Sequence, residues 1–214
     1  TGSVDVNLAD SQVAFANGRK RTNSAPWRDG GANRECLPLY AMTLLMPQDD
    51  GTFLPWLATG YTVSEDQTTF TFKIRSDAVY QDGTPVTAAD LKAYWEHGGM
   101  PERIIAWGGS MLLGLRDIKG MQEVMAGDTT VASGLVAIDD HTLEVTMEGP
   151  TPTFPHVVGI DQTGFTKMAQ VKADPEDWHW NPIGTRPYGV TVDKETGHTE
   201  VRRVDLLGMH SMFG

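Results

Sequence analysis

Histidine side chains are the residues from which a metal or acid–base site would most simply be built. The chain has six of them, His97, His141, His156, His179, His198 and His210, and no two stand four residues apart. That spacing, with a carboxylate nearby, would place two zinc ligands on one face of a helix. The sequence therefore predicts scattered surface histidines, no metal site and no cofactor.

Cysteine and paired acids give no stronger signal for catalysis. Cys36 is the one cysteine, so no intrachain disulfide can form, and its place before the apolar run 37–46 favours a small buried residue over a nucleophile. Asp139 and Asp140 would suit acid–base or metal chemistry, but adjacent carboxylates at a hairpin tip are typical turn formers. No nucleophile elbow or phosphate-binding glycine loop is present. We expect no catalytic residue and no enzyme activity.

Trp178, His179 and Trp180 form the densest aromatic group in the chain. Aromatic rings can enclose a cation. The acidic, proline-containing run 174–177 just before them is typical of a turn or a helix entry, so packing in the core is the favoured interpretation.

Bulk composition sets the outer limits on function. The 214 residues, 40% hydrophobic and 21% charged, can form one globular domain or two small ones. The net charge of −11 argues against nucleic acid as a partner, because binding to phosphates requires clustered cations. The basic cluster at 19–21 lies in a stretch rich in glycine, asparagine, serine and proline, and is predicted to be a solvated loop.

The chain shows no apolar run long enough to cross a bilayer and no leader after Thr1. We therefore expect a soluble chain that has been processed or cut at its start.

The clearest predicted strand covers residues 68–75. Phe70, Phe72 and Ile74 alternate with polar residues, which indicates one buried and one solvated face. The turn-rich residues 64–67 predict an antiparallel hairpin with residues 61–63.

A helix start is predicted at Thr87, which can cap the amide of Asp90 while the Asp90 carboxylate reaches back. Val86 and Leu91 are spaced as a hydrophobic staple. The helix should end at Gly98 and Gly99 and bury Ala88, Leu91, Tyr94 and Trp95.

Further elements follow the same rules. A second hairpin is predicted from 134–138 and 142–147, with Val136 and Ile138 facing inward opposite Leu143, Val145 and Met147. A helix is predicted near 166–173 and a last hairpin from 188–191 and 199–203, whereas the apolar run 37–46 fits either a helix or a strand. The predicted fold class is α+β, a mixed α/β arrangement.

An ordered series of motifs carries a family resemblance. Its members are Leu54-Pro55-Trp56-Leu57-Ala58, Tyr61-Thr62-Val63-Ser64-Glu65-Asp66, Thr69-Phe70-Thr71-Phe72-Lys73-Ile74-Arg75, Asp82-Gly83-Thr84-Pro85, Thr87-Ala88-Ala89-Asp90, Ile138-Asp139-Asp140-His141-Thr142-Leu143-Glu144-Val145 and Asn181-Pro182-Ile183-Gly184-Thr185. The series resembles the family 5 extracellular solute-binding proteins, the dipeptide-, oligopeptide- and nickel-binding components of ABC importers.

The resemblance implies a fold of the type II periplasmic-binding-protein kind, with two lobes that close around a ligand. Residues 1–40 would begin the first lobe, 41–155 would form a small β-rich domain with the capped helix, and 156–214 would return to the first lobe. It also implies capture of a small solute, with a peptide as the leading class, delivery to an ABC permease in the membrane, and a periplasmic or extracellular location.

Ligand-facing residues are implied by position in two loops and at one aromatic side chain. For Tyr40 and Trp107, packing in the core is the alternative interpretation. The full set is Gly30, Gly31, Ala32, Asn33, Tyr40, Trp107, Gly108, Gly109 and Ser110.

Two departures from the family pattern shape the expectation. Arg186 stands where the family usually has the second glycine of Gly-Thr-Gly-Pro-Tyr, so a long cation replaces a residue tolerant of unusual backbone angles. The chain also ends at Gly214, before the family's second lobe. We expect an incomplete first lobe plus the small β-rich domain. The alternative is a truncated gene product or a protein-interaction module that binds no ligand of its own.

Overall fold

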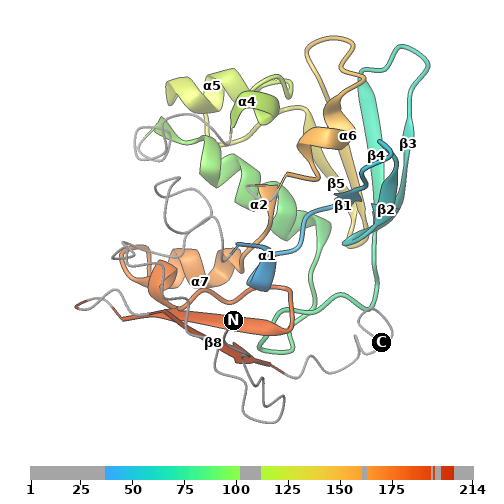
Figure 1. Ribbon diagram of the computed structural model, residues 1–214. Helices are drawn as coiled ribbons and strands as arrows, with labels where there is room; N and C mark the ends of the chain where they lie inside the picture. The colour runs from blue at the N-terminus through green and yellow to red at the C-terminus, as the bar shows by residue number, and fades with distance from the viewer. Residues whose placement is uncertain (1–36, 102–111, 161–162, 194, 196–198, 205–214) are drawn as a thin grey trace.

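An antiparallel sheet of four strands dominates one end of the computed structural model, and a separate two-stranded hairpin lies at the other end (Figure 1). The structure describes residues 37–101, 112–160, 163–193, 195 and 199–204. The strands are β1 (Leu45–Pro47), β2 (Phe53–Pro55), β3 (Ala58–Val63), β4 (Thr69–Ile74), β5 (Leu135–Asp139), β6 (Thr142–Thr146), β7 (Tyr188–Val192) and β8 (Thr199–Arg203).

The helices are mostly short. They are α1 (Leu37–Tyr40), α2 (Ala88–Gly99), α4 (Leu112–Leu115), α5 (Met121–Ala126), α6 (Phe154–Val157) and α7 (Met168–Ala173), followed by a 3-10 turn at Trp178–Trp180.

The first predicted hairpin is confirmed as β3 and β4, in the sheet order β3-β4-β6-β5. Phe70, Phe72 and Ile74 are all buried, as their alternation predicted. The connecting turn is held by Asp66, whose carboxylate accepts hydrogen bonds from the Ser64 hydroxyl at 2.6 Å and from the Thr68 amide at 3.1 Å. This side-chain bonding to nearby backbone is how aspartate stabilises turns.

The second hairpin is also present, but the predicted inner face of β5 is wrong. Val136 is 43% exposed and Ile138 is 55% exposed. Leu135, which lies opposite Val145, is buried instead. Successive apolar residues in this strand leave no alternation to choose a face, and a register shift between Ala137 and Asp139 at the sheet edge moves Ile138 out of step.

Helix α2 begins as predicted. The Thr87 hydroxyl accepts from the Asp90 amide at 3.2 Å, and the Asp90 carboxylate accepts from the Thr87 amide at 3.0 Å, which completes a capping box. Val86 and Leu91 are both fully buried, in agreement with the predicted staple. The helix ends at Gly99, and the residue before Pro101 is extended, as proline requires.

The other predictions are resolved as follows. The apolar run 37–46 contains both of the alternatives, first α1 and then β1. Helix α7 begins two residues after the predicted start at 166, and the last hairpin is confirmed as β7 paired with β8. Cys36 lies outside the described residues.

Buried apolar side chains form two groups. The main core joins the sheet to α2, α5, α6 and α7, with Trp95 packed 5.5 Å from Phe165 between ring centroids. The second core consists of Tyr40, Ala41, Val190, Val192 and Val201. The two groups do not follow the predicted boundaries 1–40, 41–155 and 156–214 closely, because the main core extends to Trp178. Those boundaries stay a prediction.

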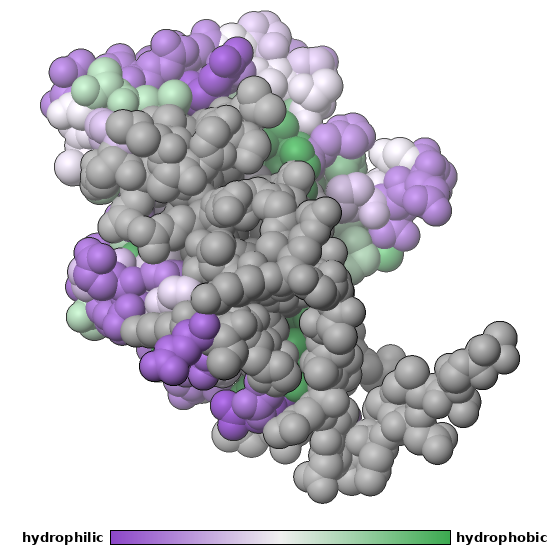
Figure 2. All heavy atoms as spheres, turned by 60° about the vertical axis from the view of Figure 1, so that its left-hand side comes forward, coloured by the Kyte–Doolittle hydropathy of each residue, from purple (hydrophilic) through white to green (hydrophobic). Residues whose placement is uncertain are grey.

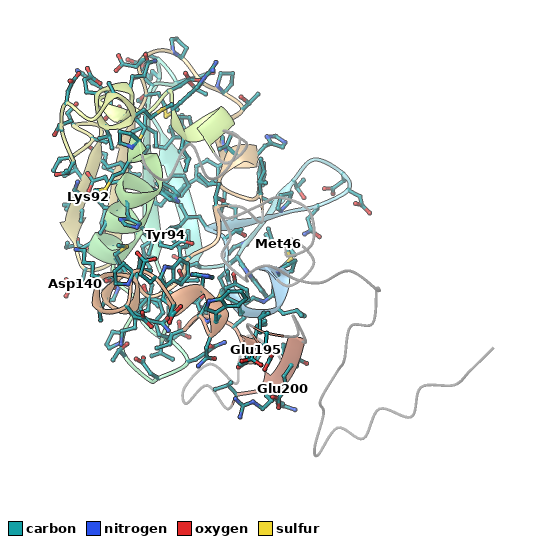
Figure 3. The ribbon with its side chains drawn as sticks, turned by 90° about the vertical axis from the view of Figure 1, so that its left-hand side faces the viewer. Met46, Lys92, Tyr94, Asp140, Glu195 and Glu200 are labelled. Atoms are coloured by element: carbon teal, nitrogen blue, oxygen red, sulfur yellow. The ribbon has the colours of Figure 1, made fainter. Side chains whose placement is uncertain are left out.

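The surface of the described residues is mainly hydrophilic on the face shown in Figure 2, with smaller hydrophobic patches between. Glu195, just after β7, and Glu200 in β8 mark the β7–β8 hairpin, at the far end from the sheet (Figure 3).

Trp178 and His179 are buried, at 2% and 3% exposure, which confirms packing as their role.

Candidate functional site

The junction segment, residues 181–188, brings together three parts of the chain that are distant in sequence. At its centre Thr185 is fully buried. Its amide donates to the Tyr40 carbonyl at 2.8 Å, and its hydroxyl accepts from the Met42 amide at 2.9 Å. These bonds join the segment to the stretch between α1 and β1. They tie the position of the segment to that of Tyr40.

Gly184 makes this approach possible. A Cβ atom at this position would lie 1.9 Å from the Tyr40 carbonyl oxygen, well inside contact distance. Only a residue without a side chain fits here, which gives the glycine of the motif a physical reason.

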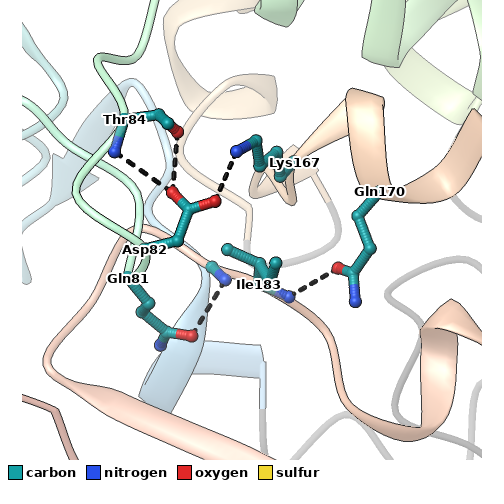
Figure 4. A network of polar contacts seen from close by, with 7 residues as sticks. Gln81, Asp82, Thr84, Lys167, Gln170 and Ile183 are labelled. Atoms are coloured by element: carbon teal, nitrogen blue, oxygen red, sulfur yellow. Dashed lines mark hydrogen bonds and ion pairs between the residues drawn. The ribbon is translucent and has the colours of Figure 1, made fainter. Parts of the chain in front are cut away.

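Gln81 holds the opposite side of the junction segment. Its amide donates to the Gly184 carbonyl at 2.9 Å, and its side-chain oxygen accepts from the Gly184 amide at 3.1 Å (Figure 4). The side-chain nitrogen donates to the carbonyls of Arg186 and Tyr188 at 2.9 and 2.8 Å. One glutamine thereby satisfies four backbone groups of the segment, as a neighbouring strand would.

Helix α7 and its start hold the first half of the segment. The Gln170 side chain accepts from the Ile183 amide at 2.8 Å and donates to the Asn181 carbonyl at 2.9 Å. The Lys167 amide donates to the Ile183 carbonyl at 2.9 Å, and its ammonium group pairs with the Asp82 carboxylate (Figure 4). Asp82 also accepts from the Thr84 amide at 3.1 Å.

The surroundings shift the pKa values of two ionisable groups here, Asp82 and Tyr80. Partial burial favours the neutral form of Asp82, but hydrogen bonds from Lys167 and Thr84 outweigh it and hold the pKa of the carboxyl below its ordinary value of 3.8. Burial, with the charges of Asp90 and Asp82, raises the pKa of Tyr80, whose ring lies 6.0 Å from the Lys167 ammonium. At neutral pH the Asp82 carboxyl is therefore ionised.

The Arg186 side chain extends the network to a fourth part of the chain. Its guanidinium carbon lies 5.1 Å from the centroid of the Trp56 ring, at the connection between β2 and β3. Both side chains are half-buried. This geometry is that of a cation–π contact.

The predicted ligand-facing residues are only partly described. Tyr40 is fully buried at the end of α1 and belongs to the second core. Gly30, Gly31, Ala32, Asn33, Trp107, Gly108, Gly109 and Ser110 lie outside the described residues. Their role stays a prediction.

Two hollows formed by described residues lie elsewhere. One of about 320 Å³ lies between the β3–β4 turn and α6, and one of about 390 Å³ lies beside α5. Tyr40 lines neither of them.

Sequence reasoning missed Gln81, Lys167 and Gln170. Each lies at or within a recognised pattern, since Gln81 precedes the Asp82-Gly83 turn and the other two lie within the predicted helix at 166–173. Long-range bonds such as Gln81 to Tyr188 leave no local pattern, so only the proximity to motifs offered a signal.

Asp139 has an ordinary structural role, and the prediction of surface histidines is wrong for His179, which is 3% exposed because it packs beside Trp178 and Trp180. The Asp139 carboxylate accepts from the His141 amide at 2.8 Å in the β5–β6 turn, and the backbone bonds lower the pKa of this carboxyl. Among the described residues, no group of three or more histidine, cysteine or acidic side chains is arranged to hold a metal ion. Within the same part of the chain, no helix has the length and apolar character needed to span a bilayer.

Comparison with known sequences gives a consistent result. Residues 52–205 match the family model of bacterial extracellular solute-binding proteins, family 5. The chain is 33% identical over 176 residues to the periplasmic oligopeptide-binding protein OppA of Escherichia coli K12, covering 81% of this chain and 32% of that protein. It is 32% identical over 114 residues to the periplasmic murein peptide-binding protein MppA of the same organism, covering 52% of this chain and 20% of the relative. These relatives are solute-binding proteins and not enzymes.

Solved structures support the same fold. An oligopeptide ABC transporter substrate-binding domain from Bacillus anthracis superposes with a TM-score of 0.74 at 23% identity, covering 88% of this chain and 37% of that one. Peptide-bound OppA from Listeria monocytogenes gives 0.73 at 23% identity, covering 82% and 35%. The expected mixed α/β fold of the type II periplasmic binding proteins is confirmed.

Each of these matches covers most of this chain but only part of the relative. The chain spans about a third of the length of OppA of Escherichia coli and of these two structures. The family model, by contrast, covers most of this chain, from the start of β2 to just after β8. The chain therefore belongs to the family 5 bacterial extracellular solute-binding proteins.

Proposed function

We propose that this chain is part of the substrate-binding component of an ABC importer and captures a small solute, with a peptide as the ligand class. The observation that carries the proposal is the family match over residues 52–205. The relatives OppA and MppA are oligopeptide- and murein peptide-binding proteins, which supports a peptide over other solutes. The implied partner is a membrane permease, and the implied location is periplasmic or extracellular.

The junction segment is the part of the described structure that best suits a supporting role in such a site. It holds the main chain at Tyr40 through two bonds to one carbonyl, from the amides of Thr185 and Arg186. Residues that line a ligand site bind more tightly when they are already ordered, because ordering them during binding costs free energy. We therefore propose that residues 30–33 and 107–110, together with the part of the chain at Tyr40, contact the ligand.

Binding to short peptides tests the proposal. The purified chain, and the longer product if the gene continues in frame, would be titrated by isothermal calorimetry with a set of short peptides and, as controls, with free sugars. Saturable heat with peptides and none with sugars is expected. If neither protein binds any peptide, the proposed capture of peptides is wrong.

A second candidate is a truncated gene product or protein-interaction module that binds no solute of its own. It is favoured by one observation, that the chain spans about a third of the length of its relatives. Sequencing the gene beyond codon 214 separates the two candidates. An in-frame continuation into a second lobe supports solute capture, and a stop codon there supports the alternative.

A further inference from the structure

Arg186 contacts three parts of the described structure that are distant from it in sequence. Its amide donates to the Tyr40 carbonyl at 3.1 Å, and its carbonyl accepts from the Gln81 side chain at 2.9 Å. Its guanidinium lies over the Trp56 ring. One residue therefore contacts the end of α1, the stretch between β4 and α2, and the connection between β2 and β3.

The contact with Trp56 also bridges the two groups of buried side chains. Trp56 packs against the main core, whereas Tyr40 belongs to the second core. Backbone–backbone bonds attach the junction segment to Tyr40, to Gln81 and, at Ile183, to Lys167. The stacked guanidinium adds an attachment on the side of the main core, between two half-buried side chains where water screens the interaction only in part.

We propose that Arg186 is a positioning residue, which fixes the backbone of residues 184–186 against Tyr40 by stacking on Trp56. The planar guanidinium is required for this role. A lysine would keep the charge, but its compact and strongly hydrated ammonium group does not stack on a ring in the same way. The bearing of this contact on ligand capture rests on the proposed function, while the positioning itself does not.

Hydrogen exchange at single amides, measured without any ligand, tests the positioning. Arg186→Lys is expected to raise the exchange rates of the Thr185 and Arg186 amides about fivefold, the effect of losing one cation–π contact. The Phe72 amide in β4 serves as an internal reference and should keep its rate. General destabilisation would instead raise all three rates together.

A double-mutant cycle with Trp56 gives the second readout. Trp56→Leu should raise the same two exchange rates, Trp56→Phe should largely preserve them because a ring remains, and Arg186→Lys should add little to Trp56→Leu. Arg116→Lys, an exposed arginine on the chain after α4, is the matched control and should change nothing. If Trp56→Leu fails to fold, the exchange rates in Arg186→Lys, compared with the Phe72 amide, still test the positioning role.

Two results would overturn the inference: unchanged exchange at Thr185 and Arg186 in Arg186→Lys, or fully additive effects of the two single substitutions. In a separate experiment, Arg186→Lys is titrated with a short peptide that binds the unaltered protein. Its affinity should be about fivefold weaker, because the same cation–π contact is lost. If no peptide binds the unaltered protein, the proposed function fails while the exchange result stands. If peptides bind and their affinity is unchanged, the positioning does not extend to the ligand.

Discussion

The main core and the second core are stabilised in different ways. In the main core a four-stranded sheet packs on α2, and large side chains such as Trp95, Phe70 and Phe72 are wholly or almost wholly buried. The second core has five buried residues and the two-stranded β7–β8 sheet. A two-stranded hairpin is marginal without other support. In the described structure the hairpin packs on Tyr40 and Ala41, and polar side chains, chiefly Gln81 and Gln170, hold the junction segment that leads into it.

This difference has a functional meaning. Apolar packing is non-directional and gives stability, whereas hydrogen bonds with fixed geometry specify where a backbone lies. The part of the chain beside Tyr40 is the part held by directional contacts. We interpret the main core as the scaffold and the junction segment as the element it positions.

The largest effect is expected from truncating the scaffold. Trp95→Ala removes a fully buried ring that packs on Phe165 and should lower the free energy of unfolding by about 3–5 kcal/mol. Urea denaturation followed by circular dichroism measures the change. Val131→Ala, at a side chain 53% exposed, is the control and should change stability by less than about 0.5 kcal/mol. Equal effects of the two substitutions would contradict the account.

A smaller effect, confined to the second core, is expected from Gly184→Ala. The new methyl group would meet the Tyr40 carbonyl, and such overpacking costs about 1–3 kcal/mol. Amides of β7 and β8 should then exchange faster while those of β4 do not. Gly60→Ala, where the added atom meets nothing within 4 Å, is the matched control. Slower or unchanged exchange in β7 with Gly184→Ala would show that the close approach carries no constraint.

Gln81→Ala should have an effect of similar or smaller size in the same region. It removes the side-chain partner of the Gly184 amide and of the Arg186 and Tyr188 carbonyls, at about 0.5–1.5 kcal/mol for bonds that are partly buried or exposed. Hydrogen exchange of the junction segment reports the loss. Gln48→Ala removes a glutamine whose bond to the Pro47 carbonyl is exposed, and should leave these amides unaffected. A global loss of stability without this local change would contradict the assigned role.

Asp82→Asn is expected to give the smallest effect, and one that depends on pH. The Asp82–Lys167 pair is partly exposed, so its loss should cost no more than about 1 kcal/mol at pH 7. Because the pKa of Asp82 is lowered in the folded chain, its stabilisation is present above the ordinary value near 3.8 and is lost as the pH falls through the folded value. The difference between Asp82→Asn and the unaltered chain should therefore disappear in acid. A difference that persists at a pH where NMR titration shows Asp82 to be protonated in the folded chain would rule out the ion pair as its source.

Local patterns predicted the scaffold well and the junction poorly. The alternation around Phe70 and the capping box at Thr87 depend on neighbours in sequence, so both could be read directly. Val136 and Ile138 were misplaced because the strand is apolar on both faces and shifts register at the sheet edge. The bonds of Gln81 span more than a hundred residues and follow from the tertiary fold alone.

The family could be inferred from the order of the motifs, while the predicted ligand-facing residues could not be tested in the same way. Of the predicted ligand-facing residues the structure describes Tyr40 alone, and it shows that side chain buried. Thr185 and Gly184 were recognised as parts of a motif, but the reason for them, the close contact with Tyr40, required the structure.

The most direct test of the central claim, that the junction segment frames a peptide site, is hydrogen exchange with and without a bound short peptide. Peptide should slow exchange at the Thr185 and Arg186 amides and in β7, and should leave the Phe72 amide unchanged. Protection that is unaltered at the junction segment, or that increases only in β4, would contradict the account.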